Sequence, residues 1–174
     1  MDRSGYPGNG LRFSVSRITG DRWKDFRYIR LEALEADPAA FGSTLEREAG
    51  FSDSDWMRRV EQYASSPDDC LFLAEVDGSV AGMAAIYRAG DIFNVVSVWV
   101  DPSCRGRGLG RLLMDELASW MKRNHPGSIL RLEVNPEKLA AMNLYRSVGF
   151  MPTGRTSILG EPPRGSTIEM ELRP

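Results

Sequence analysis

Hydrophobic residues recur with two different periods in the first part of the chain. Residues 11–18 alternate between hydrophobic and polar types, which predicts a strand with one buried face. The segment that follows has a helical period, and its hydrophobic positions are Trp23, Phe26, Ile29 and Ala33. We expect this helix to begin at an Asp21 cap and to stop at Asp37-Pro38.

A second helix is predicted after a loop or short turn at residues 41–44. Ser52 or Asp53 can cap this helix, which should run to about Ser65. Its helical spacing is set by Trp56, Val60 and Tyr63. Two helices therefore precede the main run of strands.

The middle of the chain changes to the pattern of a β-sheet. Residues 70–76 and 80–87 are predicted strands, joined at Asp77-Gly78, a dipeptide that supplies the positive φ angles of a tight hairpin turn. Residues 92–100 are nearly all hydrophobic and rich in β-branched types. We therefore expect that strand to lie centrally in the sheet, with both faces covered.

Helices and strands follow one another in the last third of the chain. After a Gly-rich segment at 105–110, a helix ending at residues 125–127 is predicted from an apolar stripe. The stripe comprises Leu109, Leu112, Leu113, Leu117, Trp120 and Met121. A strand is expected at 129–134, and a helix should run from Pro136, in its first turn, to Gly149.

Two closing strands are predicted at 150–158 and 166–172, around a turn at 160–165. Because strands and helices are mixed without strict alternation, we expect an α/β or α+β fold with helices on both faces of the sheet. We expect residues 1–10 to form a flexible tail and residues 11–174 to form one domain.

Composition excludes several classes of protein. A net charge of −2 over 174 residues argues against a broad nucleic-acid-binding face. The apolar runs are too short to cross a bilayer, and the start lacks the hydrophobic stretch of a secretory signal, so a cytoplasmic protein is expected. Cys70, Cys104 and the single histidine, His125, build neither a zinc site nor a disulfide framework, and we expect no metal.

A strand that delivers glycines to the start of a helix carries the clearest chemical signal. The loop reads Arg105-Gly106-Arg107-Gly108-Leu109-Gly110-Arg111. Free backbone N–H groups meet the positive end of the helix dipole at such a place, so the loop is an anion site that suits a pyrophosphate. It has neither the lysine of a P-loop nor the spacing of a dinucleotide-binding loop, which disfavours an ATP-dependent enzyme.

Two blocks of the sequence resemble the GCN5-related N-acetyltransferase family. Arg105-x-x-Gly108-x-Gly110, after Val-x-Val-Asp-Pro, resembles that family's acetyl-CoA loop. Residues 132–150, with a Leu-Tyr pair and a closing Gly-Phe pair, resemble its later strand–helix–strand motif. The stretches at 30–34 and 40–44 are also similar to many members.

That resemblance implies both a fold and an activity. The fold is a mixed, mostly antiparallel sheet of about six or seven strands with helices on both faces. The activity is transfer of the acetyl group of acetyl-CoA to a primary amine, by direct attack in a ternary complex. The acceptor is a small-molecule amine or a protein N-terminus, between which the fold alone does not choose.

The same resemblance implies where acetyl-CoA binds. The strands at 92–100 and 129–134 would splay apart and leave a slot for the pantetheine arm, whose amides would pair with the backbone at Val98 and Val100. The Val100 N–H would then stabilise the oxyanion. The pyrophosphate would lie on Arg105, Gly106, Arg107, Gly108, Leu109, Gly110 and Arg111. Lys138 stands where the family commonly has Asn, so it would contact phosphate or point to solvent.

The attacking amine must first lose a proton, because a lysine-like amine has a pKa near roughly 10.4. Glu133 is the first candidate for the base, since its spacing to Tyr145 is similar to that of the base and acid in the ribosomal-protein alanine acetyltransferase branch. The alternatives are a water, another residue, or a Glu133 that only ties down its strand. Tyr145 is the candidate acid for the departing thiolate and a cofactor contact, or else a core tyrosine. Cys104 has no neighbouring base and is expected to be a bystander.

Four residues are candidates for the acceptor pocket, namely Tyr28, Phe41, Ser43 and Thr44. The four tryptophans are expected to pack in the core instead. A homodimer joined through the final strands is an open expectation. The alternative function is a regulatory module that binds acetyl-CoA without turnover, which predicts cofactor binding but no release of thiol.

Overall fold

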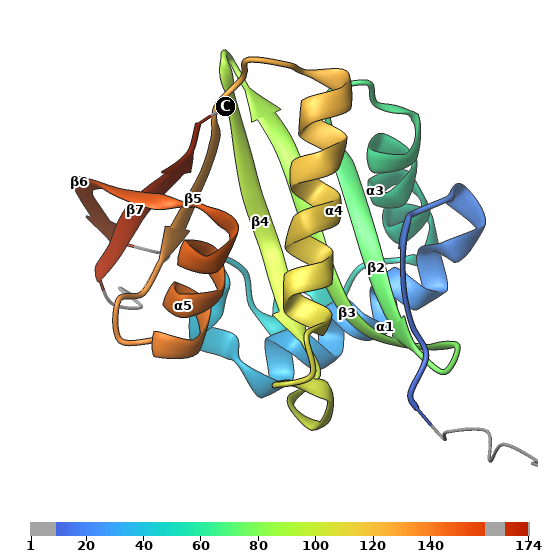
Figure 1. The fold of residues 1–174 in the computed structure, drawn as a ribbon. Helices are drawn as coiled ribbons and strands as arrows, with labels where there is room; N and C mark the ends of the chain where they lie inside the picture. Colours follow the sequence, from blue (N-terminus) through green and yellow to red (C-terminus); the bar gives the residue numbers. More distant parts are fainter. Residues whose placement is uncertain (1–9, 159–165, 174) are drawn as a thin grey trace, which may run out of the picture.

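The computed structural model describes residues 10–158 and 166–173 and contains one seven-stranded sheet with helices on both faces (Figure 1). The tail expected at 1–10, apart from Gly10, and the turn expected at 160–165 lie outside these ranges. The strands are β1 (Phe13–Arg17), β2 (Cys70–Val76), β3 (Ser79–Ala89), β4 (Ile92–Val100), β5 (Leu130–Val134), β6 (Met151–Ile158) and β7 (Ser166–Leu172). The helices are α1 (Trp23–Ala36), α2 (Leu45–Ala49), α3 (Asp53–Ser65), α4 (Leu109–Asn124) and α5 (Leu139–Val148).

The strand order is β1-β2-β3-β4-β5-β7-β6, and only the β4–β5 pair is parallel. The mixed, mostly antiparallel sheet is therefore confirmed. Its central strand is β4, as the hydrophobic run at 92–100 predicts. The hairpin at Asp77-Gly78 is confirmed too, with φ angles of 50° and 84°.

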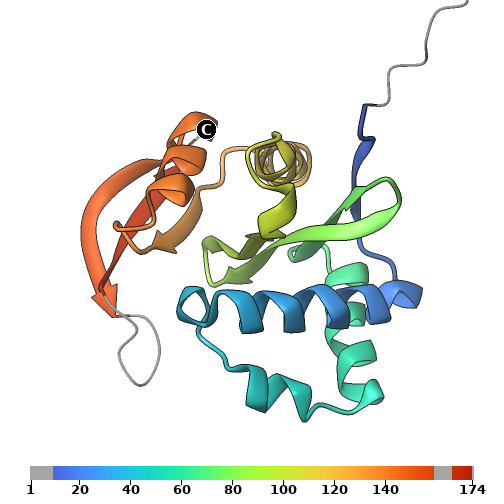
Figure 2. The same cartoon turned by 90° about the horizontal axis from the view of Figure 1, so that it is seen from below.

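Two hydrophobic layers hold the helices on the sheet. One layer packs α4 and α5 against one face, and the other packs α1 and α3 against the opposite face (Figure 2). All four tryptophans are buried, as expected, and Trp56 of α3 is fully enclosed, with its ring against Phe26 of α1 and Phe51. Burial on both faces leaves the ends and edges of the strands as the places where a ligand can reach the sheet.

The parallel strands β4 and β5 separate soon after they begin to pair. Only Phe93 with Leu130 and Asn94 with Arg131 are in register, and the two ribbons then diverge (Figure 1). On its other edge β4 carries a bulge, because its register with β3 shifts between Val96 and Trp99. The splayed strands expected from the family resemblance are thus present. The prediction that both faces of β4 are covered is wrong, because residues 94 and 96–98 are only half-buried along this opening.

Three local predictions need correction. Asp21 does not cap α1; it lies within a 3-10 turn, Gly20–Arg22, that precedes the helix. Pro136 is not in the first turn of α5. It lies in a separate turn before the helix, in which the Asn135 side chain accepts the Glu137 N–H and the Asn135 carbonyl accepts the Lys138 N–H. The short helix α2 was not predicted, since five residues carry too little periodicity.

Candidate active site

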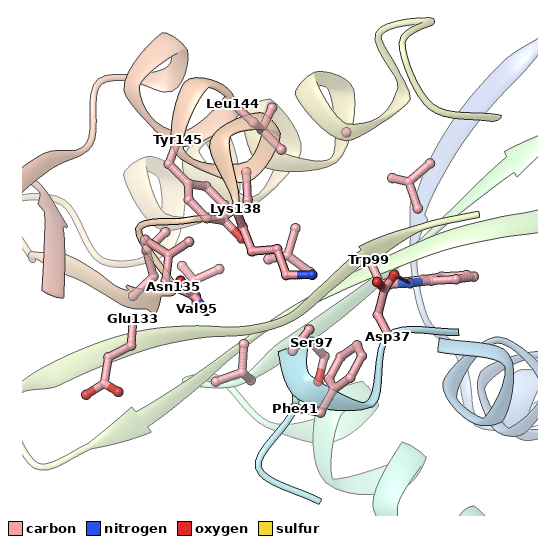
Figure 3. Close-up of a pocket in the computed structure, with 18 of the residues that line it drawn as sticks. Asp37, Phe41, Val95, Ser97, Trp99, Glu133, Asn135, Lys138, Leu144 and Tyr145 are labelled. Atoms are coloured by element: carbon pink, nitrogen blue, oxygen red, sulfur yellow. Dashed lines mark hydrogen bonds between the residues drawn. The ribbon is translucent and has the colours of Figure 1, made fainter. Parts of the chain in front are cut away.

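A cavity of about 1130 Å³ lies where β4 and β5 diverge. It is bounded by the second half of β4, the Gly-rich loop, the start of α5, and the segment between α1 and α2 (Figure 3). Most of the predicted site residues line it. They are Phe41, Ser43, Val98, Val100, Arg105, Gly106, Gly108, Gly110, Arg111, Glu133, Lys138 and Tyr145.

Four predicted site residues do not line the cavity. Tyr28 is 54% exposed, because α1 turns its opposite face toward the core. Thr44 caps α2, where its hydroxyl accepts the Arg47 N–H. Leu109 is 1% exposed and packs in the core, so only its backbone is available at the start of α4. Arg107 is exposed and makes no ion pair or hydrogen bond with any residue of 10–158 or 166–173.

The glycines of the loop are required by its backbone and by close packing. Gly106 and Gly108 have φ angles of 74° and 90°, which L side chains rarely adopt, and Gly108 is the N-cap residue of α4. Gly110 is helical, but a Cβ there would lie 3.3 Å from the Leu144 side chain of α5. The loop thus brings the start of α4 beside α5 and places at the cavity wall the first N–H groups of α4, which have no partner inside the helix.

The cations around the cavity have different partners. Arg105 donates to the Val100 carbonyl at 2.8 Å and to Asp37 at 2.7 Å. Arg111 pairs with Asp115 and also donates to the Ser147 carbonyl at 2.9 Å, which ties α4 to the end of α5. The Lys138 side chain reaches across the slot, on the way to Trp99 and Asp37 (Figure 3).

Asp37 is held as a carboxylate at the mouth of the slot. Burial would raise its pKa, but hydrogen bonds from Arg105 and Trp99, with the charges of Arg105 and Lys138, keep the pKa below its usual value. The Trp99 indole N–H donates to it at 2.9 Å. Asp37 therefore joins the end of α1 to both β4 and the Gly-rich loop.

The Val100 backbone N–H points away from β3 and into the opening. Asp101 donates its N–H to the Ala81 carbonyl at 2.8 Å, and successive residues of an antiparallel strand direct these groups to alternate sides. Val100 therefore directs its N–H and carbonyl toward the side that β5 has left. The carbonyl already accepts Arg105, and the N–H is the group that an oxyanion would need.

Tyr145 has both features that the sequence left as alternatives. It is 8% exposed and packs beside Phe150, with ring centroids 6.1 Å apart, so it is a core residue of α5. It also lines the cavity, and its hydroxyl points from α5 toward β4 (Figure 3). Burial raises the pKa of the phenol well above its ordinary value, which makes the group a hydrogen-bond donor more than a source of free protons.

Glu133 lines the cavity from the side of the sheet opposite to Tyr145. Its carboxylate points away from Tyr145 (Figure 3), as the alternation of side chains along β5 requires. It accepts a hydrogen bond from the Thr167 hydroxyl at 3.2 Å and has no ion pair within 10–158 and 166–173. The candidate base, Glu133, and the candidate acid, Tyr145, thus lie on different sides of the slot.

Several cavity residues were not predicted as functional. Asp37, Trp99 and Arg30 are the clearest, and only Arg30 left a signal in the sequence. It lies on the apolar face of α1, next to Ile29 and one turn after Phe26, where a charged residue needs a buried partner. The partner, Glu48, lies in the helix that periodicity did not reveal.

Within 10–158 and 166–173 no three histidine, cysteine or acidic side chains gather as they would around a metal ion. Cys70 and Cys104 are both free, and burial raises the pKa of Cys70 to about 12, so that thiol stays protonated. None of the helices in those ranges is long and apolar enough to span a bilayer.

Comparison with known proteins identifies relatives of this chain. A family model described as the acetyltransferase (GNAT) family matches residues 24–150. The chain is 32% identical over 135 residues to the N-alpha-acetyltransferase RimI of Mycobacterium tuberculosis, covering 75% of this chain and 83% of the relative. Two solved structures share its fold. An acetyltransferase from Streptococcus pneumoniae has a TM-score of 0.78 at 20% identity, covering 94% and 100% of the two chains. The putative acetyltransferase yncA from Salmonella typhimurium, solved with acetyl-CoA, has 0.76 at 19%, covering 93% and 94%.

Proposed function

The chain belongs to the acetyltransferase (GNAT) family and is an N-acetyltransferase, and we propose that it binds acetyl-CoA in the slot between β4 and β5 and passes the acetyl group directly to a primary amine. The observation that carries this proposal is the coincidence of the splayed strands, the Gly-rich start of α4 and Tyr145 around one cavity. Membership of this enzyme family argues against the alternative function, a regulatory module that binds acetyl-CoA without catalysing transfer.

The donor site is proposed from backbone geometry. The pyrophosphate lies on the N–H groups from Gly106 to Gly110, where the helix dipole of α4 favours negative charge. The pantetheine arm follows the open edge of β4 and pairs with the backbone at Val98 and Val100. This places the thioester carbonyl near the Val100 N–H, which stabilises the oxyanion as the tetrahedral intermediate forms.

The two proton transfers are assigned to opposite sides of the slot. The amine approaches on the Glu133 side and gives up a proton to Glu133, directly or through a water. The neutral nitrogen then bonds to the thioester carbon to give the tetrahedral intermediate. As the intermediate collapses, the carbon–sulfur bond breaks, the nitrogen gives its second proton to water, and CoA leaves as a thiolate that is protonated by water. Tyr145 donates a hydrogen bond to the departing thiolate, which lowers the cost of the negative charge on sulfur. Because its pKa is raised, this hydrogen bond contributes more than full proton transfer does.

We propose a protein N-terminus as the first acceptor class to test. The RimI relative, an N-alpha-acetyltransferase by name, matches most of this chain and most of its own length. The Glu133 carboxylate, which accepts from the neutral Thr167 hydroxyl and has no ion pair within 10–158 and 166–173, also suits an acceptor that arrives as an ammonium ion. Small-molecule amines remain the second class, because the cavity walls include neutral and aromatic groups such as Tyr63, Tyr87 and Asn94.

The test is release of thiol from acetyl-CoA across a panel of N-terminal peptides, polyamines, aminoglycosides and amino acids, with the product confirmed by mass spectrometry. Tyr145→Phe should lower kcat on the acceptor that the parent uses. Tyr28→Phe is the matched control, because Tyr28 lies outside the cavity, and it should behave as the parent. Binding of acetyl-CoA without thiol release from any amine would reject the proposed activity.

A further inference from the structure

Arg30 is a buried charge whose three nitrogen atoms are all engaged. Arg30 is only 6% exposed, although it lines the cavity. Nε and one terminal nitrogen donate to the two carboxylate oxygens of Glu48, at 3.0 and 2.7 Å. The other terminal nitrogen donates to the Ser97 hydroxyl at 3.2 Å. One guanidinium therefore joins α1 to α2 and both helices to β4.

The Glu48 end of this arrangement is fixed. Glu48 is 2% exposed and also accepts from Arg59 at 2.9 Å. Burial opposes ionisation of Glu48, but the hydrogen bonds and charges of Arg30 and Arg59 outweigh it, and its pKa falls to about 2. Since Glu48 stays charged and doubly paired, it keeps the plane of the Arg30 guanidinium in one orientation.

The Ser97 end lies at the bulge of β4. Ser97 has a φ angle of 57°, a left-handed conformation that is uncommon for residues other than glycine. The bulge makes Val96 and Ser97 face the α1 side in succession, and from there Val98 and Val100 face the α4 side. The backbone groups that would meet the thioester are thus downstream of a strained residue that Arg30 holds in place.

The same guanidinium also supports the acceptor side of the cavity. It lies 4.8 Å from the centre of the Phe41 ring, and both Phe41 and Ser97 line the cavity. Figure 3 shows these two side chains together, on the opposite side of β4 from Tyr145. A single buried charge therefore contacts the acceptor wall and the strand that carries the oxyanion donor.

We propose that Arg30 is a positioning residue for acetyl transfer: by tethering Ser97 it holds the β4 bulge in the conformation that aims the Val98 and Val100 backbone at the thioester. The proposal rests on the proposed function of this slot. In this role Arg30 contacts neither acetyl-CoA nor the amine. The tether acts on the rate of the chemical step and leaves the binding of the cofactor phosphates, on the Gly-rich loop, largely unchanged.

Ser97→Gly separates the tether from the backbone strain. Glycine adopts the positive φ freely, so the variant keeps the bulge accessible and removes only the hydroxyl. We expect kcat to fall about tenfold, as for the loss of one hydrogen bond to a charged group, and KM for acetyl-CoA to rise by less than that, because the phosphate contacts on the Gly-rich loop are kept. Ser97→Asn offers a side-chain oxygen and tolerates a left-handed backbone, so it should recover part of the rate.

A second readout does not depend on turnover. Amide hydrogen exchange at Val98 and Val100, followed by NMR in the presence of CoA, should be faster in Ser97→Gly than in the parent. The matched control is Ser14→Gly, the same change on β1, the edge strand that β2 and β3 separate from β4, which should alter neither kcat nor exchange in β4.

The possible results separate this proposal from the proposed function. If Ser97→Gly leaves kcat unchanged, or leaves exchange at Val98 and Val100 unchanged, the proposed role of Arg30 is wrong. It is also wrong if Ser14→Gly lowers kcat to the same extent. A parent that acetylates no amine rejects the proposed function, while the exchange measurement still decides whether Ser97 is tethered.

Discussion

Lys138 shows at the residue scale how one side chain changes the electrostatics of the slot. It occupies the start of α5, lines the cavity and contributes to the low pKa of Asp37. We predict that Lys138→Met raises KM for acetyl-CoA severalfold, because one cation facing the anionic cofactor is lost. The effect should shrink as salt is added, since salt screens exposed charges. Lys122→Met, in the last turn of α4 outside the cavity, is the control.

Glu48 gives the chain a pH-dependent stability. Because its pKa is lowered from 4.5 to about 2 on folding, its stabilisation is present above pH 4.5 and is lost as the pH falls toward 2. At about 1.4 kcal/mol per pKa unit this amounts to about 3 kcal/mol. The free energy of unfolding of Glu48→Gln, measured with urea across this pH range, should therefore vary less than that of the parent. Parallel pH dependences would contradict the assignment.

The residues that the sequence misplaced share a physical reason. Tyr28 and Thr44 were expected in the acceptor pocket together with Phe41 and Ser43, yet helix geometry turns Tyr28 outward and capping occupies Thr44. Asp37 could not be recognised, because its partners, Trp99 and Arg105, are distant in sequence. Spacing within one element is readable from a sequence, whereas contacts between elements are not.

At the scale of elements, the close contact of α4 with α5 depends on Gly110. A Cβ at this position would meet the Leu144 side chain at 3.3 Å. We predict that Gly110→Val separates the two helices, lowers Tm and raises KM for acetyl-CoA, because Tyr145 and the Gly-rich loop move apart. Gly50→Ala is the control, since a Cβ there has only ordinary contacts, 3.5 Å or more from its neighbours. An unchanged KM in Gly110→Val would show that the loop does not depend on this packing.

Most elements could be predicted, and the exceptions are informative. Strands β2, β4 and β7 and helix α3 begin or end within a residue or two of the expected positions, because long periodic segments carry a strong signal. The bulge at Ser97 could not be read from a run of β-branched residues, since it is created by the register with β3. The separation of β4 from β5 was expected from family resemblance, and periodicity gave no sign of it.

At the scale of the whole molecule, the slot is assembled from segments that are far apart in the chain. Asp37 at the end of α1 pairs with Arg105 in the Gly-rich loop, and Arg30 holds Ser97 in β4. The proposed acceptor side and the proposed donor side of the cavity are therefore joined by ion pairs and hydrogen bonds before any substrate binds. Such an arrangement favours direct transfer between two substrates that are bound at the same time.

The measurement that tests this account most directly is the initial rate of thiol release while acetyl-CoA and the accepted amine are both varied. Direct transfer in a ternary complex predicts double-reciprocal lines that intersect, and Cys104→Ala should keep the parent's rate. Parallel lines would indicate a covalent acetyl-enzyme and would contradict the account, most clearly if Cys104→Ala also abolished turnover.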